Sequence, residues 1–215
     1  MNKKRKKDNI DDQLEVEITQ LDLMEMIGAK IDQREIYLFG PVDTNGILSV
    51  IESIHFLEKK DQDRDIELYI NSDGGYVDDC FALIDVMDAS PCDIKVIVLG
   101  RAASAACLIA SNGTYGKRYS GRNAEFMYHE STGDLPPVRL SEMKYWKEEM
   151  TRIENKCNRI FSRNTGQSLK IINDMFSNRH LDRWMVPLEA KKFGIIDKIL
   201  PIKKRVNKKI IEIEE

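Results

Sequence analysis

The chain has 215 residues, of which 32% are charged and 42% are hydrophobic, and its formal net charge is −3. Such a length and composition suit one soluble globular domain with short appendages. The slight excess of acidic residues argues against nucleic acid as the main partner, and no apolar run approaches the roughly 18 residues that a membrane-spanning helix needs. Because no hydrophobic segment follows the basic N-terminal run, as a signal peptide would require, we expect a cytoplasmic protein.

Both ends of the chain are polar. Residues 1–33 begin with the basic run 3–7, and acidic side chains follow directly. This pattern is typical of a partly disordered N-terminal segment. Residues 201–215 are expected to form a charged C-terminal tail.

The cysteines are spread along the chain. Cys80, Cys92, Cys107 and Cys157 lie far apart and form no C-x-x-C pair. They predict neither a zinc site nor a disulfide framework. We expect no metal and no cofactor.

The first half of the chain alternates strand and helix patterns. Residues 35–40 and 65–72 favour strands, and the second is followed by Asp73, Gly74 and Gly75. Apolar residues with helical spacing run from 47 to 57, after a cap at Asp43 or Thr44, and again from 77 to 87. This alternation predicts an α/β fold with a mainly parallel sheet, whose ligand crevice lies at the carboxyl ends of the strands.

A lone serine follows the next strand. Residues 94–99 favour a buried strand that Gly100 ends, and an Ala-rich helix begins just after Ser104. Backbone N–H groups at a helix start have no intrahelical partner, so a hydroxyl there lies beside ready-made anion donors. Ser104 is therefore a candidate nucleophile with an oxyanion site beside it, or it is a helix N-cap.

Another strand, residues 125–128, leads to His129 and then to a polar loop over 130–138. The helix after that loop has a heptad-like apolar seam, and Gly166 ends it. A seam so long and narrow is typical of a helix that packs against another helix, within the chain or across an interface. Its members are Met143, Trp146, Met150, Ile153, Cys157 and Ile160.

The last part of the chain adds a carboxylate. A short helix from about Ser168 precedes Asp182, and a helix beginning at Pro187 and a strand over 195–200 follow it. A nucleophilic serine needs a base to take its proton, and that base needs a carboxylate to fix its tautomer. Ser104, His129 and Asp182 supply these three groups, although a structural histidine and a turn carboxylate are the alternatives for the last two.

Several stretches together resemble a known family, the proteolytic subunit of the Clp protease. They are 68–75 (LYINSDGG), 100–104 (GRAAS), 127–129 (MYH), 165–168 (TGQS) and 182–184 (DRW), with Glu189, Ala190 and Gly194 beyond. The resemblance implies repeated β-α units around a mainly parallel sheet. It also implies a peptidase domain over 34–200 and a protruding handle helix in the region of about 130–165.

The resemblance implies roles for individual residues. Ser104 would be the nucleophile, His129 the general base and Asp182 its orienting carboxylate, with the backbone N–H groups of Gly75 and Ala105 as the oxyanion hole. A glycine at 75 also suits an amide that must approach the substrate closely. The substrate-binding residues would be Gly74, Glu130, Ser131, Thr132 and Gly133.

The resemblance also implies an assembly. It would be a homo-oligomer of stacked heptameric rings that cleaves unfolded polypeptides in a chamber and works with an AAA+ unfoldase ATPase. The chain departs from the family pattern at Asp73, Arg101 and Leu181, where the family has Pro, Gln and Arg. The alternatives are an inactive ring subunit and, because the fold is shared, a crotonase-type acyl-CoA enzyme. A Ser-His-Asp triad argues against both.

Overall fold

The structure, a computed structural model, describes residues 33–132, 139–177 and 182–201. The expected N-terminal segment and charged tail therefore lie outside the described residues, except for residues 33 and 201. Within the described ranges no helix is long and apolar enough to cross a membrane.

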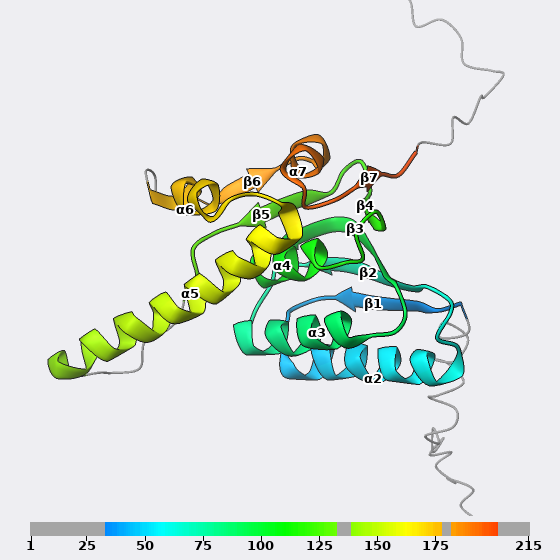
Figure 1. The fold of residues 1–215 in the computed structure, drawn as a ribbon, viewed down its shortest axis with the longest axis horizontal. Helices are drawn as coiled ribbons and strands as arrows, with labels where there is room; N and C mark the ends of the chain where they lie inside the picture. Colours follow the sequence, from blue (N-terminus) through cyan, green and yellow to red (C-terminus); the bar gives the residue numbers. More distant parts are fainter. Residues whose placement is uncertain (1–32, 133–138, 178–181, 202–215) are drawn as a thin grey trace, which may run out of the picture.

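The described residues form a seven-stranded sheet with helices around it (Figure 1). One path of parallel strands has the order β1 (Glu35–Phe39), β2 (Ile66–Ser72), β3 (Ile94–Ala103), β4 (Arg118–Ser120), β7 (Lys198–Ile199). Off this path, β5 (Glu125–Tyr128) pairs in parallel with β3 and antiparallel with β6 (Arg183–Met185). The predicted α/β fold with a mainly parallel sheet is confirmed.

The helices connect these strands and cover the sheet. In Figure 1, α2 and α3 lie together on one side of β1 and β2, while α6 and α7 lie on the far side of the molecule beside β5 and β6. The helices are α2 (Thr44–Lys60), α3 (Val77–Ala89), α4 (Ala105–Ser111), α5 (Met143–Thr165), α6 (Leu169–Ser177), α7 (Pro187–Phe193) and the short 3-10 helix η1 (Leu140–Glu142).

The central strand β3 runs through Gly100, so the prediction that this glycine ends the strand is wrong. The register of β2 against β3 passes from Ile70 opposite Val98 to Ser72 opposite Ala102, which leaves Asn71 facing a bulge. A Cβ on Gly100, whose φ is +87°, would lie 2.7 Å from the Asn71 Oδ1. The glycine thus permits a bulge inside the strand.

This bulge separates two halves of β3 that have different neighbours. Residues 96–98 pair with β4, whereas residues 101–103 pair with β5. The second half of β3 and the whole of β5 therefore end side by side. Ser104 follows the one and His129 follows the other.

The long helix α5 divides into two parts. Cys157 and Phe161 in its C-terminal half are buried in the main hydrophobic core, and Ile153 and Ile160 pack against that core. The N-terminal half projects from the body (Figure 1), and there the Met143 side chain is 51% exposed. Among the described residues, the predicted seam therefore packs on the main core from Ile153 to Ile160, and its N-terminal members lie outside that core.

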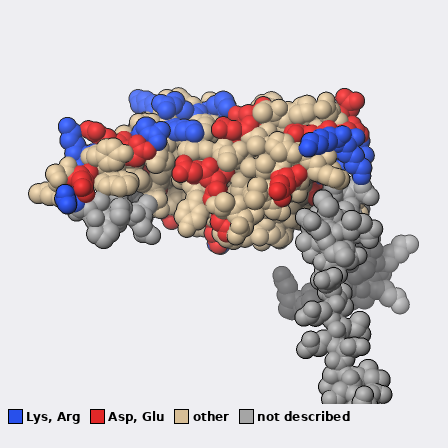
Figure 2. Space-filling model, turned by 90° about the horizontal axis from the view of Figure 1, so that it is seen from below, with Lys and Arg blue, Asp and Glu red and all other residues tan. Residues whose placement is uncertain are grey.

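Charged side chains of both signs are distributed over the face that Figure 2 shows. Seen from below in Figure 2, blue and red groups alternate across the face formed by the described residues, with uncharged surface between them. An interspersed pattern of this kind differs from the single-sign basic stripe that binds nucleic acid backbones.

Candidate active site

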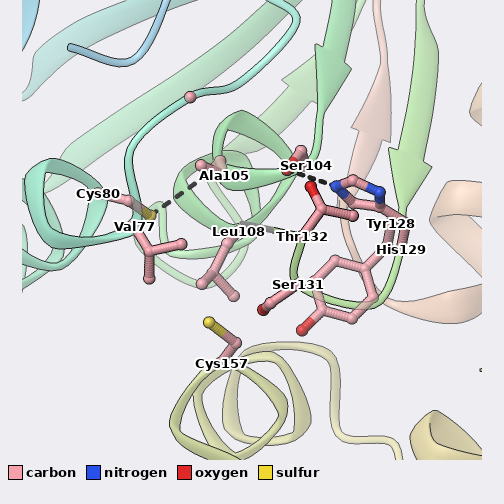
Figure 3. A pocket seen from close by; sticks show the side chains of 11 residues that line it. Val77, Cys80, Ser104, Ala105, Leu108, Tyr128, His129, Ser131, Thr132 and Cys157 are labelled. Atoms are coloured by element: carbon pink, nitrogen blue, oxygen red, sulfur yellow. Dashed lines mark hydrogen bonds between the residues drawn. The ribbon is translucent and has the colours of Figure 1, made fainter. Parts of the chain in front are cut away.

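Ser104 lies between the end of β3 and the start of α4. Its backbone has φ 54° and ψ −124°, a conformation that glycine usually occupies, and its side chain makes no N-cap hydrogen bond. The backbone N–H of Ser104 donates to the carbonyl of Met127 at 2.8 Å, which ties the turn to β5. The hydroxyl is therefore free of the capping role that the sequence left open, and it points into the crevice beyond the strands (Figure 3).

His129 faces this hydroxyl from the end of β5. The Nε2 of His129 lies 2.7 Å from the Oγ of Ser104. The parallel pairing of Ala103 with Met127 brings the two side chains together, because Ser104 directly follows β3 and His129 directly follows β5. With Nδ1 protonated, Nε2 can accept the proton of the hydroxyl, which is the arrangement that a serine nucleophile requires.

Asp182 approaches the other side of the imidazole. Its Oδ1 lies 3.6 Å from the Nδ1 of His129, within ion-pair distance and beyond a hydrogen bond. Antiparallel pairing brings it there, because Tyr128 is opposite Arg183, and His129 and Asp182 are the next residues along. The Asp182 side chain is 53% exposed, whereas that of His129 is 20% exposed.

The two glycines after β2 lie against the serine turn. Gly74 has φ +95°, and a Cβ there would lie 2.6 Å from the carbonyl oxygen of Ala103 and 2.8 Å from the Cβ of Ser104. A Cβ on Gly75 would lie 2.1 Å from the carbonyl oxygen of Val42. Glycine is thus required at 75 because the backbone of Val42 leaves no room for a Cβ. The predicted close approach of the substrate is a second reason for glycine there.

Two backbone amides beside Ser104 have no acceptor among the described residues. Val42 bonds to the carbonyl of Gly74 and to the amide of Tyr76, so the amide of Gly75 between them points away from Val42. Among the described residues, neither this amide nor that of Ala105, the first residue of α4, donates a hydrogen bond. Both residues line the pocket that contains Ser104. Two such amides can hold an oxyanion.

The segment after His129 is described only in part. Glu130 is exposed, while Ser131 and Thr132 line the pocket beside Ser104; Gly133 lies outside the described residues. The amide of Ser131 donates to the Glu154 Oε2 on α5 at 2.7 Å. This bond ties the segment to the body of the protein where it borders the pocket.

The pocket itself is small, and polar and apolar groups line it in similar measure. It has a volume of about 60 Å³ and lies between α3, α4, α5 and the end of β5 (Figure 3). Side chains that the sequence did not single out as site residues form much of its wall: Val77, Cys80, Leu108, Tyr128 and Cys157. The only sequence signal for them was their position, since Val77, Cys80 and Cys157 lie on apolar helix faces and Tyr128 precedes His129.

The Cys80 and Cys157 thiols and the Tyr128 hydroxyl in this wall are uncharged near neutral pH, because burial raises the pKa of each. Burial raises the pKa of the Cys157 thiol to about 11. Burial also raises the pKa of Tyr128, whose hydroxyl donates to the Asn158 Oδ1 at 2.9 Å. The pocket thus offers a neutral cavity directly beside the Ser104 hydroxyl.

Comparison with known proteins places this geometry in context. A model of the family described as "Clp protease" matches residues 19–203, which contain Ser104, His129 and Asp182. The "ATP-dependent Clp protease proteolytic subunit" of Streptococcus mutans serotype c is 37% identical over 171 residues, 79% of this chain and 86% of that protein. The protein with the same name from Streptococcus pneumoniae (strain Hungary19A-6) is 35% identical with the same coverage.

Proposed function

Because this chain belongs to the Clp protease family, as its motifs predicted, we propose that it is a serine endopeptidase that cleaves unfolded polypeptides. The observation that carries the proposal is the 2.7 Å contact between the Ser104 Oγ and the His129 Nε2. The amides of Gly75 and Ala105 beside this pair, which donate to no acceptor in the described ranges, support acyl transfer. The same arrangement argues against an inactive ring subunit.

In each half of the proposed reaction His129 first accepts a proton and then gives it up. The Ser104 Oγ bonds to the substrate carbonyl carbon while its proton passes to the His129 Nε2, and the amides of Gly75 and Ala105 bind the oxyanion. His129 then protonates the leaving amine as the peptide C–N bond breaks, which leaves an ester on Ser104. A water molecule then bonds to the ester carbon while His129 takes its proton, and His129 returns that proton to the Ser104 Oγ as the ester bond breaks, which regenerates the serine. Asp182 stabilises the imidazolium in both halves.

The pocket beside Ser104 is proposed to bind the side chain that precedes the cleaved bond. Its volume of about 60 Å³ and its neutral wall suit an apolar side chain of small or medium size. Gly74, Glu130, Ser131, Thr132 and Gly133 are proposed to contact the substrate backbone. The proposed peptidase chemistry involves no metal or cofactor.

The proposed assembly is a homo-oligomer of stacked rings, heptameric in each layer, in the cytoplasm. The relatives' name, "ATP-dependent Clp protease proteolytic subunit", supports work with a separate AAA+ unfoldase ATPase. The projecting half of α5, whose Tyr145 is 63% exposed, supports a contact between copies there. We propose 34–200 as the peptidase domain, with its handle region over about 130–165.

Hydrolysis of a fluorogenic peptide and of unfolded casein tests the activity. The native protein should cleave both, and Ser104→Ala should lose cleavage by several orders of magnitude while it folds normally. Ser53→Ala is the matched control, because the Ser53 hydroxyl is exposed and bonds only within its helix, to the carbonyl of Ser49 at 2.8 Å. Equal activity of the wild type and Ser104→Ala would refute the proposal.

A further inference from the structure

Arg101 lies at the bulge of β3, and its guanidinium contacts three other side chains. Its Nη1 is 2.8 Å from the Asp73 Oδ1, and its Nη2 is 3.6 Å from the Glu125 Oε2. Its guanidinium carbon lies 5.2 Å from the centre of the Trp184 ring. A guanidinium over an indole at this distance is a cation–π contact, and the two carboxylates limit where the guanidinium can lie.

Trp184 belongs to the strand β6, which Asp182 directly precedes. This strand, β6, has three residues and lies at the edge of the sheet, where it pairs only with β5 among the described strands. Met185 is buried, but Arg183 and Trp184 are exposed. The β5 ladder, Met185 and the Arg101 contact are therefore the anchors that the described structure gives to this short strand.

The position of Asp182 depends on these anchors. Its Oδ1 stands 3.6 Å from the His129 Nδ1, too far for a hydrogen bond to hold it there. Asp182 is also half exposed, so few contacts with the described residues restrain its side chain. A displacement of β6 by less than 1 Å would decide whether the carboxylate can stabilise the imidazolium, because positioning errors of that size alter catalytic rates strongly.

We propose that Arg101 is a positioning residue for Asp182 and acts through Trp184. The carboxylates of Asp73 and Glu125 fix the guanidinium, and the guanidinium fixes the indole ring. The indole ring in turn fixes β6, the strand that Asp182 directly precedes. The inference rests on the proposed function, because it concerns the carboxylate of the same triad.

Steady-state kinetics of Arg101→Met tests this proposal. The variant keeps the aliphatic bulk and removes the charge, and it should lower kcat for a fluorogenic peptide about tenfold. KM should change less than about twofold, because Arg101 is absent from the wall of the pocket beside Ser104. Arg101→Lys, which retains a cation, should recover most of the rate.

Lys95→Met is the matched control on the same strand. Lys95 pairs with the Glu67 Oε1 at 2.7 Å and lies 5.1 Å from the centre of the Tyr119 ring, so it makes the same kinds of contact at the opposite end of β3. The Lys95→Met variant should leave kcat unchanged. An equal loss in Lys95→Met would assign the effect to general stability and overturn the proposal.

The Asp182→Asn background separates positioning from a general structural effect. If Arg101 acts through Asp182, Arg101→Met should cost nothing further once the carboxylate is gone. Trp184→Leu should behave in the same way and provides a second route if Arg101→Met does not fold. A normal kcat in Arg101→Met, or a tenfold loss that persists in Asp182→Asn, would overturn the inference. Wild-type activity of Asp182→Asn alone would instead overturn the proposed role of Asp182.

Discussion

Ser104 holds a backbone φ of 54° while its Oγ lies 2.7 Å from the Nε2 of His129. A side chain at such a φ costs roughly 1–3 kcal/mol, and the surrounding structure must offset that cost. Here the amide of Ser104 is tied to β5 and the helix α4 begins at the next residue. The turn thus holds the hydroxyl against the imidazole and leaves the first amide of the helix open.

The strain at this turn makes a prediction about stability. Ser104→Gly should be more stable than Ser104→Ala by about 1 kcal/mol. Glycine adopts this conformation without a Cβ clash, whereas the Cβ of alanine keeps the clash. Both variants should be inactive. Chemical denaturation of the two variants measures the difference, and a less stable glycine variant would contradict a strained turn.

The second prediction concerns the two partners of the serine. His129→Ala should be as inactive as the serine variant, whereas Asp182→Asn should fold normally and react roughly 10³- to 10⁴-fold more slowly, since the imidazole then favours the wrong tautomer. Measurements of kcat for a peptide substrate decide this. Near wild-type rates in Asp182→Asn would exclude Asp182 as the orienting carboxylate.

Asp197 can be compared with Asp182, because it is a partly buried carboxylate that pairs with an arginine in place of a histidine. Its Oδ1 lies 2.7 Å from the Arg118 Nη2. Burial acts against ionisation of Asp197, but the hydrogen bonds from Arg118 outweigh it and hold the pKa of this carboxyl below its ordinary value. A lowered pKa in the folded state means that the charged form stabilises the fold at neutral pH.

We therefore predict that Asp197→Asn loses stability and keeps its chemistry. The free energy of unfolding of the variant should be about 3 kcal/mol lower than that of the wild type at pH 7. The kcat of the folded variant should stay within about twofold of the wild-type value. The difference should shrink as the pH falls through the lowered pKa of Asp197, where the wild type also loses the charge. Denaturant titrations at pH 7 and about pH 3 measure this. An inactive but equally stable variant would make Asp197 the catalytic carboxylate.

The pocket beside Ser104 gives a prediction about cleavage preference. Cys157→Leu should fill much of the cavity, so that kcat/KM for a peptide with Leu before the cleaved bond falls about tenfold relative to one with Ala. Cys92→Ala, a change at a buried cysteine outside this pocket, should leave the ratio unaltered. A ratio that does not move in Cys157→Leu would show that this pocket does not bind that side chain.

The projecting half of α5 gives a prediction about assembly. Ile153 packs against the core, so a charge there would disturb the fold of the subunit itself. The exposed residues Met143 and Tyr145 are better targets, and the double change to Glu should reduce the size of the particle and lower peptidase activity at least tenfold.

Lys147→Glu is the control for added negative charge, because Lys147 is an exposed polar residue on the same helix. Native mass spectrometry of both variants decides the question. A Met143→Glu, Tyr145→Glu protein that retains the wild-type mass and activity would contradict an interface at this part of α5.

Much of the fold could be predicted from periodicity. The amphipathic α2, with its cap at Asp43, and the long α5, with Gly166 at its end, follow from apolar spacing and capping residues. The three-residue strands β4 and β6 were missed, because so few residues show no period. The strand β3 was cut short at Gly100, since the bulge depends on Asn71, which lies on another strand.

The approach of the candidate site residues depends on pairings between distant parts of the chain. Ser104 and His129 follow strands that the sequence pattern predicts, so their approach could be expected from a parallel sheet. Asp182 reaches His129 because β6 pairs antiparallel with β5, and no local sequence pattern predicts that pairing. The pocket wall was missed for a similar reason, since it combines α3, α4 and α5.

Labelling of the native particle with a fluorophosphonate, followed by peptide mapping and native mass spectrometry, tests the central claim most directly. The reagent forms a bond only with an activated serine, so it should label Ser104 alone, on a particle of several copies, and should fail on His129→Ala. No label, a label on another serine, or full labelling of His129→Ala would contradict the claim that Ser104 is a nucleophile activated by His129.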